Sequence, residues 1–123
     1  MPRILIADDA ENIRELVRVS LEDEGYEIFE ASDGNDALEK ARKLKPDMVI
    51  LDVMMPGKTG YVVCEELKAD PATKHIFVLF MTARGSPLAQ ATANQRGGDG
   101  FMAKPFEPAQ LRDKVKKALG IAG

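Results

Sequence analysis

Short apolar runs alternate with stretches in which apolar residues recur every three or four positions. The runs have the length and composition of buried strands. They cover Arg3 to Ala7, Glu27 to Ala31, Met48 to Leu51, Ile76 to Met81 and Asp99 to Met102. The stretches between and after them have helical spacing, and they cover Ile13 to Leu21, Asn35 to Leu44, Tyr61 to Lys68, Ser86 to about Arg96, and Glu107 to Leu119.

This strict alternation predicts an α/β fold. A strand, a crossover helix and a second strand favour a parallel sheet that is covered by helices on both faces. Five such units are too few for an eightfold barrel, which leaves a doubly wound sheet. The 123 residues contain no repeat, low-complexity segment or linker. We therefore expect a single domain over residues 1–123, with a core from about 2 to 120.

Composition narrows the class of function. The chain is 45% hydrophobic and 30% charged, as in ordinary globular proteins, and its net charge of −3 argues against non-specific binding to nucleic acid. It lacks the pattern of a signal peptide and any apolar run near the roughly 20 residues of a membrane span. We expect a cytoplasmic protein. Its one cysteine, Cys64, lies among apolar residues and is predicted to be a buried, reduced thiol.

Polar residues mark the ends of four apolar runs, and they supply the candidate chemistry. They are Asp8 and Asp9, Asp52, Thr82 and Lys104. The carboxyl ends of parallel strands form one edge of the sheet, where ligands bind in open α/β folds. Nucleotide-binding relatives of this architecture place a glycine-rich loop after the first strand, whereas this chain places two carboxylates there. Such acids repel phosphate unless a cation lies between them, and Mg2+ prefers oxygen ligands.

Each of these residues has an ordinary interpretation when taken alone. An Asp before a helix caps it, a strand-end Asp caps a turn, a Thr suits a strand, and a Lys is usually solvated. Together they form the set that phosphoryl transfer requires. Asp52 is a candidate nucleophile, and Lys104, Thr82 and Mg2+ could each stabilise one equatorial oxygen of the transferred group. Pro105 follows the lysine and can hold a cis bond there.

The joint pattern resembles the receiver domain of two-component response regulators. It comprises Asp8-Asp9, Asp52 followed by Met55-Pro56 and Gly60, Thr82-Ala83, and Lys104-Pro105-Phe106. The resemblance covers about residues 2 to 120. It implies a flavodoxin-like, three-layer (βα)5 fold with strand order 2-1-3-4-5.

The resemblance also assigns roles to the site residues. It implies that Asp52 is the phosphoacceptor and that Asp9, Asp52 and the Met54 backbone carbonyl ligate Mg2+, with Asp8 acting through water. Lys104 would pair with Asp52 and then with the phosphoryl group, and Thr82 would move to bond that group. The chain would act only on its own aspartate and would not be an enzyme in the wider sense.

Signalling output follows from the same resemblance. Phe101, three positions before the lysine, would be a switch residue that responds to Thr82 and alters the face formed by the fourth helix, fifth strand and fifth helix. Its plain interpretation is core packing, and both roles can coexist. The implied partners are a histidine kinase or histidine phosphotransfer protein and a downstream protein target. We expect no direct nucleic-acid or membrane binding. Gly100 stands where many DNA-binding relatives carry a second acid, so we expect a monomer or weak homodimer.

Three other functions stay open at this point. A haloacid-dehalogenase-type phosphatase also uses a strand-end Asp with Mg2+, but it typically has a second acid where this chain has Met54. A flavodoxin-like electron carrier would need a phosphate-binding loop and flanking aromatic residues. An inactive receiver-like scaffold would lack a residue that the chemistry needs, and none is missing.

Overall fold

A computed structural model describes residues 2–82, 92 and 95–120 of the chain. Its strands are β1 (Arg3–Ala7), β2 (Glu27–Ala31), β3 (Met48–Asp52), β4 (Phe77–Thr82) and β5 (Gly100–Ala103). Its helices are α1 (Glu11–Leu21), the short 3₁₀ helix η1 (Glu22–Glu24), α2 (Gly34–Leu44), α3 (Gly60–Ala69) and α5 (Pro108–Ala118).

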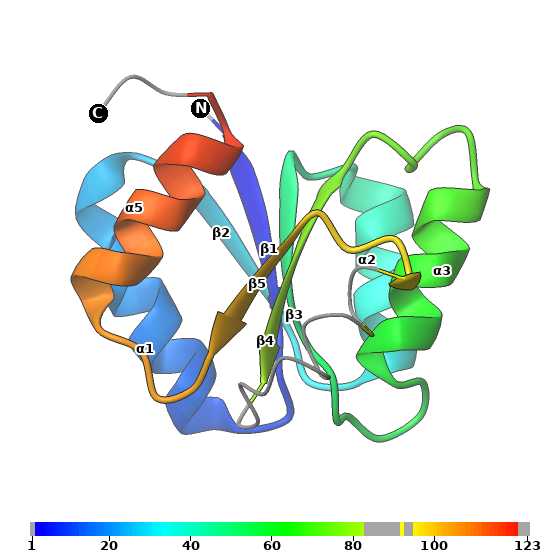
Figure 1. Cartoon of the computed structure of the whole chain (residues 1–123), viewed down its shortest axis with the longest axis horizontal. Helices are drawn as coiled ribbons and strands as arrows, with labels where there is room; N and C mark the ends of the chain where they lie inside the picture. The colour runs from blue at the N-terminus through cyan, green and yellow to red at the C-terminus, as the bar shows by residue number, and fades with distance from the viewer. Residues whose placement is uncertain (1, 83–91, 93–94, 121–123) are drawn as a thin grey trace.

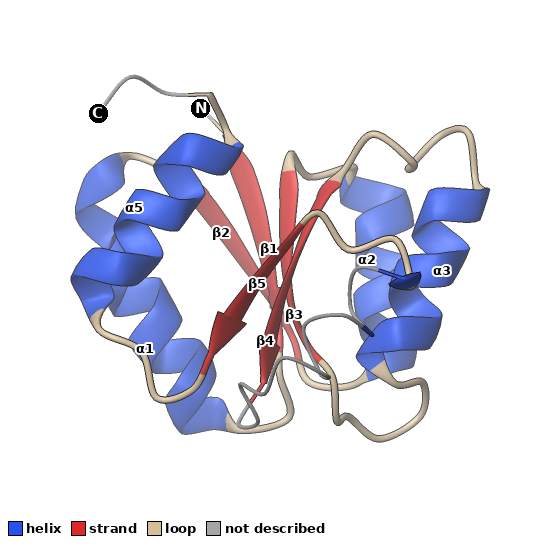
Figure 2. Ribbon diagram, in the orientation of Figure 1, coloured by secondary structure: helices blue, strands red, loops and turns tan. Residues whose placement is uncertain are grey.

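The strands form one parallel sheet in the order β2-β1-β3-β4-β5. This confirms the predicted fold class and strand order. Helices α1 and α5 cover one face, and α2 and α3 cover the other, which gives the three layers visible in Figures 1 and 2. The carboxyl ends of all strands therefore point to one edge, the lower edge in Figure 1.

Successive side chains of each strand point to opposite faces, so the sheet builds two cores. One core, between the sheet and α2 and α3, contains Leu5, Val49, Leu51, Val78 and Phe80 with helix residues such as Val63 and Leu67. The other, between the sheet and α1 and α5, contains Ile4, Ile6, Met48, Ile50 and Met81 with helix residues such as Val17 and Leu111. Because β3 is buried on both faces, its whole sequence is apolar until Asp52.

Side chains cap the starts of several helices. Asp33 accepts a hydrogen bond from the Asp36 N–H (2.7 Å) at the start of α2. Glu107 and Gln110 form a reciprocal capping box at the start of α5. These caps satisfy N–H groups that a first helical turn leaves without a partner, and so they fix where the helices begin.

Most predicted boundaries differ from the structure by one residue. Asp52 and Thr82 are the last residues of β3 and β4, not the residues after them, and β5 begins at Gly100 instead of Asp99. Backbone pairing to the next strand extends each strand to its polar end, which the apolar pattern cannot reveal. The predicted fourth helix and Ala83 lie largely or wholly outside the described residues. Cys64 is fully buried, as predicted.

Candidate functional site

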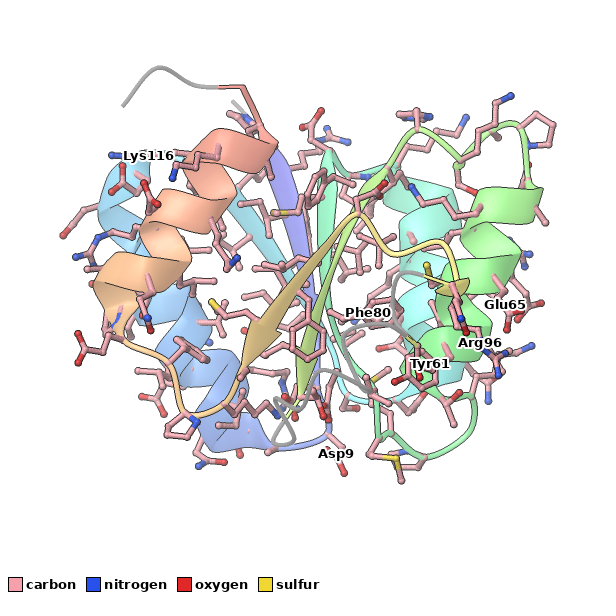
Figure 3. All side chains as sticks on the ribbon, viewed as in Figure 1. Asp9, Tyr61, Glu65, Phe80, Arg96 and Lys116 are labelled. Atoms are coloured by element: carbon pink, nitrogen blue, oxygen red, sulfur yellow. The ribbon has the colours of Figure 1, made fainter. Side chains whose placement is uncertain are left out.

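Neighbouring strand ends bring three carboxylates together. Register pairs Ala7 with Leu51, so Asp8, the residue after β1, is level with Asp52 at the end of β3. One carboxylate oxygen each from Asp8, Asp9 and Asp52 lies within 4.8 Å of the other two. Asp8 and Asp52 are buried, while Asp9 is exposed at the edge of the molecule to which the strands point (Figure 3). The predicted acid cluster therefore exists and is open to solvent through Asp9.

Asp8 is fixed in place by both its backbone and its side chain. Its N–H donates to the Ala31 carbonyl of β2 (3.1 Å). Oδ1 accepts from the Ala10 N–H (2.9 Å), and Oδ2 accepts from Lys104 Nζ (2.7 Å). Since burial of an unpaired carboxylate is costly, these bonds are what allow Asp8 to be fully buried. Both of its oxygens already have protein partners.

Lys104 follows β5 directly and supplies the cation of the site. Its ammonium group is 2.7 Å from Asp8 Oδ2 and 3.5 Å from Asp52 Oδ1, and its side chain is only 16% exposed. The pairing with Asp52 that the sequence suggested is present, but the shorter contact is with Asp8. The Lys104–Pro105 peptide bond is cis, the isomer that the sequence allowed.

Among the residues that the structure describes, one lysine pairs with the cluster of three carboxylates and does not balance their charge. The pKa of Asp52 is raised to about 6, chiefly by burial and next by the negative charge of Asp8, with a smaller contribution from Asp9. Lys104 opposes this rise without cancelling it. A site with clustered oxygen ligands and excess negative charge matches the donor set that a divalent cation such as Mg2+ takes. The residues present therefore fit the metal that the sequence implied.

The loop after β3 folds back onto the strand end. The Gly60 N–H, at the start of α3, donates to the Val53 carbonyl (2.8 Å). A Cβ atom on Gly60 would collide with the Asp52 carbonyl oxygen. Only glycine permits this close approach of α3 to the strand. Met54, which follows Asp52 by two residues in this loop, is 71% exposed.

Thr82 and Phe101 lie on the last two strands. Thr82 is 7% exposed, and its carbonyl accepts from the Lys104 N–H (2.7 Å), so the backbones that carry these two site residues are joined. Phe101 is half-buried and packs against the core beneath α2 and α3, next to Phe80 of β4. Its core-packing interpretation is confirmed, and its switch role stays a prediction.

A further cluster, which sequence reasoning missed, joins α3 to the residues before β5. The Tyr61 ring lies 5.4 Å from that of Phe80, tilted by 59°, and the Arg96 guanidinium stands 5.6 Å from the centre of the Tyr61 ring. Arg96 also donates to Glu65 (2.8 Å), one turn along the helix, as Figure 3 shows. The spacing of Tyr61 and Glu65 placed them on one helix face, but nothing local pointed to Arg96.

Comparison with known proteins decides the family. The family model of the response regulator receiver domain matches residues 4–116 of the sequence. The chain belongs to this family. The match covers nearly the whole chain, so this receiver domain is a component of two-component signal transduction. It decides against the phosphatase and electron-carrier alternatives.

Similar proteins agree with this receiver assignment. The alkaline phosphatase synthesis transcriptional regulatory protein PhoP of Bacillus subtilis is 39% identical over 118 residues, which are 95% of this chain and 48% of that protein. The DNA-binding dual master transcriptional regulator RpaA of Synechocystis is 38% identical over 97% of this chain and 49% of its own length. The chemotaxis protein CheY4 of Vibrio cholerae has a TM-score of 0.89 at 34% identity, covering 96% of this chain and 98% of its own.

These relatives leave one expectation without support. The receiver spans about half the length of PhoP and RpaA, and both are named as regulators of transcription. The expectation that the protein makes no direct contact with nucleic acid is therefore not supported. In the part of the receiver that the structure describes, no helix is long and apolar enough to cross a membrane.

Proposed function

We propose that this receiver accepts a phosphoryl group on Asp52 from a histidine kinase or a histidine phosphotransfer protein. The observation that carries the proposal is the surplus of negative charge around one buried carboxylate. Asp52 ends a central strand, beside Asp8 and Asp9, and Lys104 is the one cation among the described residues that pairs with this cluster. Burial and the negative charge of Asp8 raise the pKa of Asp52, the direction expected where clustered acids have too little positive charge beside them.

The proposed Mg2+ ligands are the carboxylates of Asp9 and Asp52 and the backbone carbonyl of Met54. Asp8 would contribute through water, which is supported by the engagement of both its oxygens with Ala10 and Lys104. When bound, Mg2+ neutralises charge on the acids and on the incoming phosphoryl group. The exposure of Asp9 leaves this side of the site open to the ion and to the donor.

The proposed reaction is an in-line transfer. An Asp52 carboxylate oxygen forms a bond to phosphorus as the bond from phosphorus to the imidazole nitrogen of the donor histidine breaks, and that nitrogen keeps the electron pair. Lys104 and Thr82 donate to the oxygens of the transferred group. The product is an acyl phosphate, which water can later hydrolyse at phosphorus to restore the carboxylate. The receiver would thus catalyse chemistry only on its own side chain.

The proposed output is a change at the face formed by the fourth helix, β5 and α5. Phosphorylation adds about −1.5 to −2 charge and three acceptor oxygens. Thr82 would turn toward them, and Phe101 would then repack. The backbone bond between Thr82 and Lys104 and the position of Phe101 beside Phe80 support a mechanical connection between the site and this face.

We propose one receiver unit over residues 1–123 that is a monomer or weak homodimer. A charged interface using Asp99 is disfavoured because one of its two carboxylate oxygens is already bonded within the chain. Its Oδ2 accepts from Lys68 Nζ (2.6 Å) and from the Val78 N–H (2.9 Å). Sedimentation velocity with and without a phosphoryl mimic tests this assembly state.

The proposed phosphorylation is tested with acetyl phosphate and Mg2+ by intact-mass spectrometry. Wild type should gain the mass of one phosphoryl group, and Asp52→Asn should gain none. The fluoride mimic of the phosphoryl group, beryllium fluoride with Mg2+, should raise the Tm of wild type only. A folded wild-type protein that responds to neither reagent would show that this chain is an inactive scaffold.

A further inference from the structure

The backbone carbonyl of Asp8 has a partner outside the sheet. Asp8 lies one residue past β1, and its carbonyl accepts a hydrogen bond of 2.7 Å from Nη1 of Arg14 in the first turns of α1. An acceptor that is left unpaired in so buried a position would cost free energy. Arg14 was not among the candidates from sequence, because a charged residue on an amphipathic helix is ordinarily solvated.

The guanidinium group of Arg14 is itself held on its other side. Its Nε donates to Glu30 Oε1 on β2 (3.2 Å), and only 16% of the side chain is exposed. Glu30 Oε2 accepts in turn from Arg18 Nη1 (2.7 Å). The planar fork of Arg14 therefore bridges β2 and the turn after β1, with two donors fixed in one orientation.

We propose that Arg14 is a positioning residue for the metal-binding carboxylates. The Asp8 carbonyl and the Asp9 N–H belong to one planar peptide group. A hydrogen bond that holds the carbonyl therefore also fixes the orientation of the backbone at Asp9. Asp9 is exposed and has little packing of its own to hold it near Asp8 and Asp52. This inference rests on the proposed Mg2+ site.

The sign of the effect on Mg2+ affinity separates positioning from electrostatics. A cation near a metal site repels the metal, so removal of the Arg14 charge would tighten Mg2+ binding if its field were what mattered. Removal of the hydrogen bond would loosen the turn and weaken binding. Loss of groups that orient metal ligands typically costs 10- to 100-fold in affinity, and we expect about tenfold here because one backbone bond is lost.

The test compares Arg14→Met with Arg18→Met. Both remove a cation paired to Glu30, and both keep an apolar stem, but Arg18 has no hydrogen bond to Asp8. Arg14 belongs to neither hydrophobic core and borders a pocket of about 140 Å³ lined mostly by polar residues, so its truncation should not open a cavity in the core. The Kd for Mg2+ is obtained from the rise of Tm with MgCl2 as the only ligand, and the Tm in EDTA reports folding.

We expect Arg14→Met to weaken Mg2+ binding about tenfold and Arg18→Met to leave the Kd within about twofold of wild type. Equal Kd values for all three proteins, tighter binding by Arg14→Met, or equal weakening in both variants would overturn the inference. If Arg14→Met does not fold, Arg14→Lys replaces it. This variant keeps the charge but has one terminal nitrogen in place of the two, Nε and Nη1, that Arg14 directs to Glu30 and to the Asp8 carbonyl, so weaker binding supports the inference and an unchanged Kd refutes it.

Failure of the proposed function has a different signature. If the Tm of wild type does not respond to MgCl2, both the proposed metal site and this inference are wrong. If wild type and Arg14→Met both respond at the same MgCl2 concentrations, only the proposed role of Arg14 is wrong.

Discussion

Replacement of Asp52 by Asn should stabilise the metal-free protein. The carboxylate is buried beside Asp8, and its pKa rises from an ordinary value of 3.8 to about 6 on folding. An acid with a raised pKa binds its proton more tightly in the folded state. Its contribution to stability is therefore greatest at low pH and is lost as the pH rises from about 4 through about 6.

The magnitude follows from the two pKa values. Their difference corresponds to about 3 kcal/mol of lost stability at neutral pH. An amide has no charge, but its burial still carries part of the desolvation cost. We therefore expect Asp52→Asn to raise the free energy of unfolding by about 1–2 kcal/mol. For a domain of this size that is a rise in Tm of roughly 4–10 °C. Lys104 keeps its bond to Asp8 in the variant and is not left unpaired.

The assay is thermal and urea unfolding in EDTA between pH 4 and 8. The variant and wild type should differ least at pH 4, diverge as the pH rises from about 4 to about 6, and keep a nearly constant gap above that. Addition of MgCl2 should narrow the gap, because the ion binds the native wild type and offsets the repulsion. Asp113→Asn, at an exposed site on α5, is the matched control and should change Tm little.

A variant that is no more stable than wild type at pH 7.5 in EDTA would refute the reasoning. So would a gap that grows toward low pH. Either result would mean that repulsion among these acids does not destabilise the folded protein. The physical argument for a cation at this site would then fail.

Three further predictions test the surroundings of the site. Gly60→Ala places a Cβ against the Asp52 carbonyl, so it should cost about 1–3 kcal/mol in urea unfolding and slow phosphorylation by acetyl phosphate; unchanged values would contradict the close packing. Lys68→Met removes bonds to Asp99 and to the Lys74 and Ile76 carbonyls, and should lower stability by about 1–3 kcal/mol; an unaltered urea midpoint would show that these bonds are not needed. Burial raises the pKa of the Cys64 thiol to about 11, so Ellman's reagent at pH 8 should react slowly with native protein and rapidly in urea; fast native reaction would exclude a buried thiol.

The sequence by itself determined the architecture and the edge of the sheet that carries the site. Strands of a parallel sheet are buried on both faces, so they appear as apolar runs that a polar residue terminates. That is why the pattern of the chain predicts Asp8, Asp52 and Lys104 at one edge of the sheet. The strand order came from resemblance to receivers, since alternation alone leaves several orders possible.

Only the tertiary structure decided which side chains contact each other. Lys104 lies closer to Asp8 than to Asp52, and Arg14 reaches a backbone carbonyl that no pattern marks. Arg96 lies over the Tyr61 ring and donates to Glu65, a residue 31 positions before it in the sequence. Such contacts depend on strand register and helix placement, which are set by packing across the whole domain. Periodicity along the chain reports which face a residue occupies, but not what lies opposite it.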